Sequence, residues 1–221
     1  MIDHHVPDSM LLDHVAGTLP MVADVLVATH LALCPRCRGE VAMMEDAAGA
    51  MLADVEPVAA DDDALLANLL GRLDDPLPQD TVGPAPFATA PPEALLPKPL
   101  RCVVGPSKDL VWSTSLPAVG KRVPLDLDLA GVPATLERVF PGRSVPSHGH
   151  EGVELTLVLA GGYTDGPGHF VRGDVQVVGP ETVHSLNIDD DGEDCVLLSV
   201  RSAGRVPDGL KARIAKWLGA I

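Results

Sequence analysis

The first third of this 221-residue chain contains no lysine, and aromatic residues make up only 3% of the whole chain. Residues 1–75 carry 14 acidic residues against three arginines, a net charge of −11, while the rest of the chain carries −4. A surface this acidic repels DNA and RNA, so we expect no direct nucleic-acid partner. It suits a basic protein partner, such as one that itself binds nucleic acid, or it serves to keep the protein soluble.

The sequence also lacks a long apolar run and a secretion signal. No run approaches the roughly 20 apolar residues that a membrane span requires. The amino terminus, MIDHHVPD, has neither the basic start nor the apolar segment of a signal peptide. We therefore expect a cytoplasmic protein without membrane contact. In that compartment a close cysteine pair is more typical of a metal or redox site than of a disulfide.

Residues 1–75 show the patterns of four short helices that could bury one shared core. Asp8 is a candidate N-cap for the first helix and Gly17 its stop, and Pro20 can open a second helix. Pro35 can occupy the first turn of a third helix. A fourth helix is expected after the acidic residues 61–63, with an apolar stripe of five leucines: Leu65, Leu66, Leu69, Leu70 and Leu73.

The remainder of the chain is different in character. Residues 76–99 hold eight of the 21 prolines and read as an extended linker. From Leu100 the pattern becomes strand-like, with many short strands and no intervening helices, which is typical of a sandwich or small barrel. The last residues, 207–221, have the apolar spacing of one final helix. The expected fold class is α+β with several domains: 1–75 helical, 76–99 linker and 100–221 a β-sandwich or barrel.

A first cluster of chemically reactive residues lies in HLALCPRC, residues 30–37. His30 and Cys34 are four apart and share a helix face, and Cys37 follows three residues later. If one helix ends near Cys34 and Pro35 starts the next, the three side chains converge at the corner. Two thiolates and an imidazole suit tetrahedral zinc, which needs a fourth ligand. The candidates are His4, His5 and His14.

Two other interpretations of the same residues remain. CPRC could be a redox pair, although that motif belongs to a βαβ context that is not visible here. The residues could also be ordinary, partly buried helix positions. Zinc would explain how so small a helical unit is held together, because structural zinc contributes on the order of 10 kcal/mol to folding.

A second cluster lies in GRSVPSHGHEGVELTLVLAG, residues 142–161. His148 and His150 are two apart on extended chain and so face the same side, and Glu154 falls on that side again. A further ligand should come from a neighbouring strand. His184 is the candidate, and His169 is the competitor. Such a set can bind Zn, Fe, Mn or Ni.

The spacing of this second cluster resembles the first cupin motif at every fixed position. The second cupin motif is only approximated around His184, because Pro180 and Asn187 are each one residue closer than usual and Thr182 stands where glycine is common. The competing interpretation is a cupin barrel whose histidines no longer bind metal.

Taken together, the two halves resemble the ChrR family of cupin-containing anti-sigma factors over essentially the whole chain. The resemblance is carried by HHV at 4–6, VATHLALCPRCR at 27–38 and HGHEGVELTLVL at 148–159. It implies zinc at His5, His30, Cys34 and Cys37, and a second metal, zinc in the family's best-known members, at His148, His150, Glu154 and His184. It implies an extracytoplasmic-function sigma factor as the partner, bound by residues 1–75, and release in response to singlet oxygen or related oxidants through the cupin.

Two further classes of protein remain as alternatives. A cupin metalloenzyme of the dioxygenase kind would need an open coordination position and a substrate pocket. Few aromatic residues are present to line such a pocket. A plain metal-storage protein is disfavoured because the two candidate sites are chemically unlike. We therefore predict a regulator rather than an enzyme.

Overall fold

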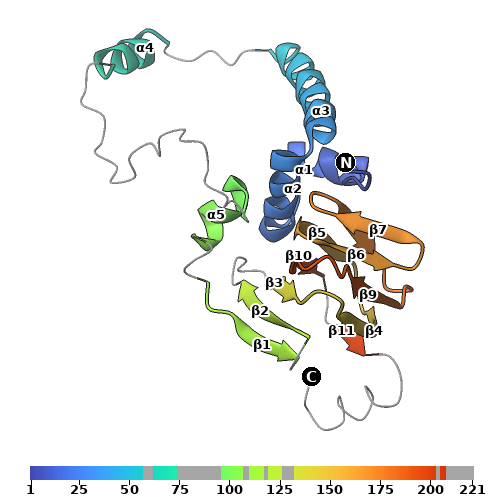
Figure 1. Ribbon diagram of the computed structural model, residues 1–221. Coiled ribbons are helices and arrows are strands. Elements are labelled where there is room, and N and C mark those ends of the chain that lie inside the picture. Colours follow the sequence, from blue (N-terminus) through green and yellow to red (C-terminus); the bar gives the residue numbers. More distant parts are fainter. Residues whose placement is uncertain are drawn as a thin grey trace.

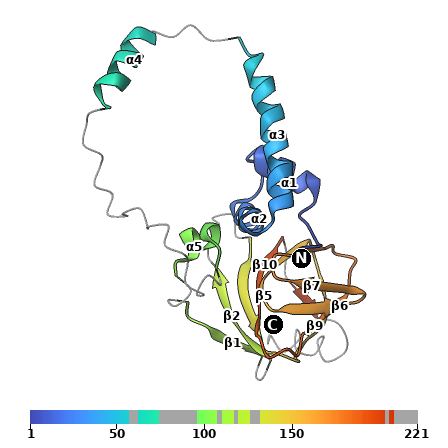
Figure 2. The ribbon, with the colours of Figure 1, turned by 45° about the horizontal axis from the view of Figure 1, so that its top comes forward.

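The computed structural model describes residues 1–56, 62–73, 96–106, 110–116, 119–125, 132–202 and 205–207. Three helices lie at one end of a two-sheet β structure, and both views show α2 next to the strands β5 and β10 (Figures 1 and 2). The apolar core runs without a break from the helices, through Val22 and Leu26, into the sheet, through Leu157 and Leu198. Helices and strands therefore share buried surface.

The three docked helices begin and end close to the predicted positions. They are α1 (Asp8–Val15), α2 (Met21–Leu33) and α3 (Pro35–Ala53). Pro20 is the N-cap of α2 and Pro35 is the first residue of α3, as predicted. Asp8 is the first helical residue rather than the N-cap, a position that Pro7 takes. Gly17, with φ of 66°, follows the end of α1.

The strands form two antiparallel sheets. One has the order β1-β2-β3-β10-β5-β8 and the other β11-β4-β9-β6-β7. Their bounds are β1 (Ser113–Leu116), β2 (Gly120–Leu125), β3 (Ala134–Val139), β4 (Ser144–His150), β5 (Glu154–Ala160), β6 (Gly162–Asp165), β7 (Gly168–Val171), β8 (Val175–Val178), β9 (His184–Ile188), β10 (Cys195–Arg201) and β11 (Arg205–Pro207). The strands β5 and β10 are buried along almost their whole length, which explains their continuous apolar sequence. The α+β class and the two-sheet cupin architecture are confirmed.

Two features differ from the sequence expectation. The chain after the proline-rich region begins with a helix, α5 (Lys98–Val104), and not with a strand. Pro97 is its N-cap and Pro99 lies in its first turn, where a missing N–H costs nothing. Leu96 and Leu100 are fully buried in the core shared with α2, so this tertiary packing decides the conformation.

The fourth helix, α4 (Asp62–Gly71), exists as predicted, but it shares no core with the other three. Its four leucines are 53–59% exposed, and Leu73, just beyond its end, is 76% exposed. Both views show α4 apart from the rest of the fold (Figures 1 and 2). The end of α3 is similar, since Met51 and Leu52 are also exposed. The predicted apolar face is present on α4, but no other part of the described chain packs against it.

None of the described helices is both long and apolar enough to cross a membrane. Most of the predicted linker and the predicted carboxy-terminal helix lie outside the described residues.

Candidate metal centres

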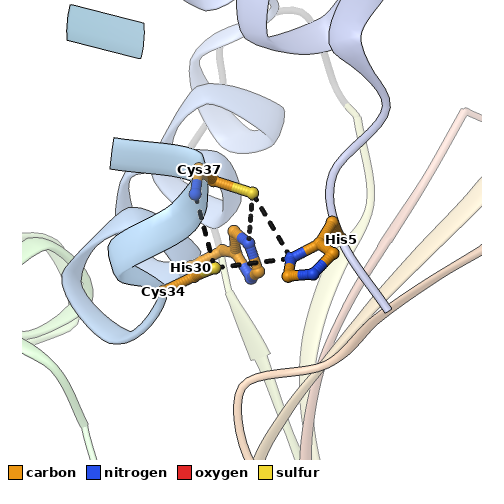
Figure 3. Close-up of side chains that lie close together, drawn as sticks. All are labelled: His5, His30, Cys34 and Cys37. Atoms are coloured by element: carbon orange, nitrogen blue, oxygen red, sulfur yellow. Dashed lines mark hydrogen bonds between the residues drawn. The ribbon is translucent and has the colours of Figure 1, made fainter. Parts of the chain in front are cut away.

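The predicted amino-terminal cluster comes together where α2 meets α3. His30 lies in the last turn of α2, Cys34 is the residue between the helices, and Cys37 lies in the first turn of α3. His5 approaches from the segment before α1, and its ring points at both sulfurs (Figure 3). The four ligand atoms lie within 4.8 Å of one another.

The separations fit a small tetrahedral ion. His5 Nδ1 lies 3.4 Å from Cys34 Sγ and 3.5 Å from Cys37 Sγ, and His30 Nε2 lies 3.2 Å from Cys37 Sγ. Bonds of about 2.3 Å to sulfur and 2.0–2.1 Å to nitrogen place two ligands of a tetrahedral zinc about 3.6 Å apart. The observed distances between donor atoms are slightly shorter. The donor set, two sulfurs and two imidazole nitrogens, is one that zinc favours.

The environment disfavours the charged forms of Cys37 and His30. Burial raises the pKa of the Cys37 thiol to about 12, and the hydrogen bond and charge of Cys34 add to the rise. Burial also lowers the pKa of His30, against the opposing effect of its bond to the Gly173 carbonyl. A neutral imidazole is the form that binds metals, and a cation would favour the thiolates.

The other two histidine candidates are engaged elsewhere. The ring of His4 lies 4.2 Å from that of Phe170, and its Nδ1 is 3.4 Å from Asp174. His14 contacts Asp24 at the start of α2. Of the three candidates, the structure brings His5 to the cysteines.

The second predicted cluster lies inside the cupin, with its donor atoms also within 4.8 Å of one another. His148 and His150 extend from β4, Glu154 opens β5, and His184 opens β9. The register pairs His148 directly with His184, so the neighbouring strand supplies the fourth residue as predicted. All four side chains are buried. The competitor His169 lies on β7, exposed and bonded to Asp189.

The donor atoms of this cluster converge more tightly. His150 Nε2 lies 2.9 Å from His184 Nε2 and 3.2 Å from Glu154 Oε2, and His184 Nε2 lies 3.7 Å from the same oxygen. With bonds near 2.1 Å, ligand edges measure about 3.0 Å in an octahedral ion and about 3.4 Å in a tetrahedral one. The residues fit a divalent ion of either geometry.

Hydrogen bonds on the far side of the imidazoles fix how they point. His184 Nδ1 lies 2.8 Å from Asp165 Oδ2, which also accepts from Gln176 Nε2. His148 Nδ1 lies 2.8 Å from the Pro146 carbonyl oxygen. Nδ1–H donates to each of these acceptors, so the Nε2 lone pair is directed at the cluster, which is how proteins orient metal-binding histidines.

A buried arginine holds Glu154. Arg201 Nε donates to Glu154 Oε1 at 2.5 Å, and another guanidinium nitrogen contacts Glu137 Oε1 at 2.7 Å. Burial opposes the charge of Arg201, but the two carboxylates outweigh it and raise its pKa. Because Oε1 is engaged in this way, Oε2 is the oxygen that faces His150 and His184.

Sequence reasoning missed these supporting residues. Asp165, Gln176 and Asp174 lie in turns and strands whose partners are distant in sequence, so no local pattern marks them. The sequence did contain a sign of Arg201, because this residue ends the largely apolar strand β10. Glu137 is likewise a charged residue within the mostly buried strand β3. A charged residue in each of two buried strands predicts a buried pair.

Comparison with known proteins gives a consistent result. No family model matches the chain. The anti-sigma-E factor ChrR of Cereibacter sphaeroides is 34% identical over 211 residues, which is 91% of each chain. A crystal structure of Rhodobacter sphaeroides SigE in complex with the anti-sigma ChrR matches with a TM-score of 0.75 and 32% identity, over 91% of this chain and 100% of that chain.

An RmlC-like cupin protein from Ralstonia eutropha matches more weakly, with a TM-score of 0.42 and 16% identity over 52% of this chain and 83% of that chain. The ChrR matches extend from the helices through the cupin, which is the range over which the sequence motifs resemble that family. This chain therefore belongs to the ChrR family of anti-sigma factors.

Proposed function

We propose that this protein binds an extracytoplasmic-function sigma factor and keeps it from core RNA polymerase in the cytoplasm. The observation that carries the proposal is the match, over 91% of the chain, to an anti-sigma factor solved in complex with its sigma factor. Family membership favours this regulatory role over the cupin metalloenzyme. We assign sigma binding to residues 1–75, the connection to residues 76–99, and the sensing cupin to residues 100–221.

The exposed apolar faces of α3 and α4 support a protein partner. Met51 and Leu52 at the end of α3, Val55 just beyond it and the leucines of α4 are all more than half exposed. Burial of such side chains against a partner protein is favourable and would stabilise the complex. A partner surface with basic and apolar patches would match the acidic amino-terminal region, where charge speeds and orients docking while apolar contacts supply affinity.

We propose zinc at His5, His30, Cys34 and Cys37, where it would tie the segment before α1 to the corner between α2 and α3. The sulfur and nitrogen donors and their tetrahedral separations support this ion. Its role is structural: it fixes how the three helices are arranged and therefore the shape of the surface that a sigma factor meets. For His148, His150, Glu154 and His184 we propose zinc as well, with Fe, Mn and Ni as the other ions that these ligands accept.

We propose that the cupin senses singlet oxygen or a related oxidant and causes release of the sigma factor. The two centres use different residues and different donor atoms, which supports a division of labour in which one centre shapes the binding surface and the other responds. Variants of the two centres should therefore behave differently.

The test is co-expression of the full chain with a sigma factor encoded nearby, followed by transcription assays with core polymerase. A stable 1:1 complex that blocks transcription is expected. Leu66→Asp combined with Leu70→Asp should weaken the complex without changing the metal content, because these side chains lie on an exposed face. His148→Ala should still inhibit but no longer respond to the oxidant. Oxygen consumption with a small substrate, lost in His148→Ala, would instead indicate an enzyme.

A further inference from the structure

The segment that carries His5 is bound to the cupin through one carboxylate. Asp174 follows β7, and its Oδ1 accepts hydrogen bonds from the backbone N–H groups of Asp3 at 2.8 Å and His4 at 3.0 Å. The Val175 N–H donates to the carbonyl oxygen of His4 at 3.0 Å. Asp174 is 1% exposed, so the acceptor carboxylate is shielded from water. The residue before His5 is thus held on both sides by the cupin.

The same turn also binds a second proposed ligand. His30 Nδ1 lies 2.8 Å from the Gly173 carbonyl oxygen, and both atoms are buried. Nδ1–H donates to that carbonyl, so the Nε2 lone pair faces Cys37. Two of the four proposed ligands, from separate parts of the chain, therefore depend on two adjacent cupin residues.

The turn is built for this close approach. Gly173 has φ of +96°, and a Cβ there would lie 2.5 Å from Ile2 Cδ1. The other carboxylate oxygen of Asp174 accepts from the Val171 N–H at 2.9 Å, and the Gly173 N–H donates to the Val158 carbonyl at 2.8 Å. These bonds fix the turn on β5, the strand that opens with Glu154.

We propose that the Gly173–Asp174 turn is the positioning element of the amino-terminal metal centre, so that metal binding there and docking of the helices on the cupin stabilise each other. This inference rests on the proposed metal at the four amino-terminal residues. Coupling of this kind is reciprocal. Loosening the turn weakens the metal site, and removing the metal loosens the turn. The cupin thereby acts on the sigma-binding unit by direct contact as well as through the linker.

Cobalt provides a probe that reports on this centre alone. Only the amino-terminal set contains sulfur, so a sulfur-to-cobalt charge-transfer band in the full-length protein reports on Cys34 and Cys37 and not on the cupin site. Asp174→Ala should weaken cobalt binding at this centre about 10- to 100-fold in a chelator competition and should reduce or shift the band. Asp174→Asn, which keeps one acceptor oxygen, should have a smaller effect.

The matched control is Asp194→Ala. Asp194 is another cupin aspartate, but it pairs with Arg138 on the outside of the sheet. The Asp194→Ala variant should leave the charge-transfer band and the cobalt affinity of the sulfur site unchanged. Asp3→Pro provides a second test that does not touch the cupin, because it removes the Asp3 N–H while the bond from Val171 to Asp174 remains. It should also weaken cobalt binding at the sulfur site, while the cupin metal is retained.

The reverse direction is measured by amide exchange. Removing the amino-terminal metal, with the cupin metal in place, should speed exchange of the Val175 amide. The positioning role is overturned if Asp174→Ala and Asp3→Pro bind cobalt as tightly as the unaltered chain. It is also overturned if the Val175 amide exchanges at the same rate with and without the amino-terminal metal. In those cases, a charge-transfer band that is present in the unaltered chain and absent in Cys34→Ser would still support the proposed metal site. A complete lack of the band in the unaltered chain would overturn both.

Discussion

The two candidate metal centres are built in opposite ways. Three ligands of the amino-terminal centre lie within eight residues at one helix corner, and the fourth arrives on a segment without regular structure. The cupin ligands lie on three strands, where register and buried hydrogen bonds hold them. The sheet register positions the cupin residues, whereas His5 reaches the helix corner on a segment that hydrogen bonds with Asp174 and Val175 hold on the cupin. We therefore expect loss of the proposed ion to change the arrangement of the helices at the first centre and to have a local effect at the second.

The largest expected difference comes from Cys34→Ser. A serine hydroxyl does not replace a thiolate, and structural zinc contributes on the order of 10 kcal/mol to the folding of small units. The variant should lose one ion per chain and bind the sigma factor at least about 100-fold more weakly, while the cupin ion stays. Metal analysis and titration calorimetry measure both effects. Cys102→Ser, at an exposed position on α5, is the control. A Cys34→Ser protein that keeps both ions would remove the distinction between the centres.

A second test concerns the charge network of the cupin. Arg201→Met leaves Glu154 and Glu137 buried without their cation, which should destabilise the protein by about 3–5 kcal/mol in urea denaturation. Arg138→Met is the matched control, because Arg138 is 45% exposed where it pairs with Asp194. An exposed pair contributes about 0–1 kcal/mol. An equal loss of unfolding free energy in the two variants would show that the buried network stabilises the protein no more than the exposed pair does.

A smaller and more selective effect is expected from Asp165→Asn. The variant replaces the carboxylate that accepts from His184 and Gln176. Metal affinity at the cupin should fall about 10- to 100-fold, and the sulfur site should be unchanged. Asp189→Asn, which alters the half-buried partner of the exposed His169, serves as the comparison in the same chelator assay. A parallel loss at both centres would mean that they are not independent.

The smallest effect should come from Cys195→Ala. Burial, with help from the charges of Asp189 and Asp191, raises the pKa of the Cys195 thiol to about 12. A thiol of this kind is unreactive near neutral pH. We expect a stability loss of about 1 kcal/mol from the lost packing and an unchanged response to oxidant in the transcription assay. If the response disappears, the cupin senses through sulfur and not through its metal.

Much of this arrangement could be predicted because its signals are local. The helix corner follows from Pro35, and the pairing of His148 with His150 follows from strand geometry. The choice of His5 over His4 and His14 could not be derived from spacing, because it depends on Asp174, more than 160 residues away. The family resemblance supplied that residue.

The apolar stripe of α4 shows a different limit. Leucines at helical spacing predict a covered face, but the pattern does not say whether the cover is the same chain or another. The helix α5 was missed for a related reason, since its packing on α2 outweighs a proline-rich sequence that reads as linker.

The most direct test of the central claim is the affinity of the full chain for its sigma factor before and after removal of the amino-terminal metal. The account predicts at least about a 100-fold loss on chelation and full recovery when zinc is restored, with the cupin ion present throughout. An affinity that stays the same in the metal-free chain would contradict it.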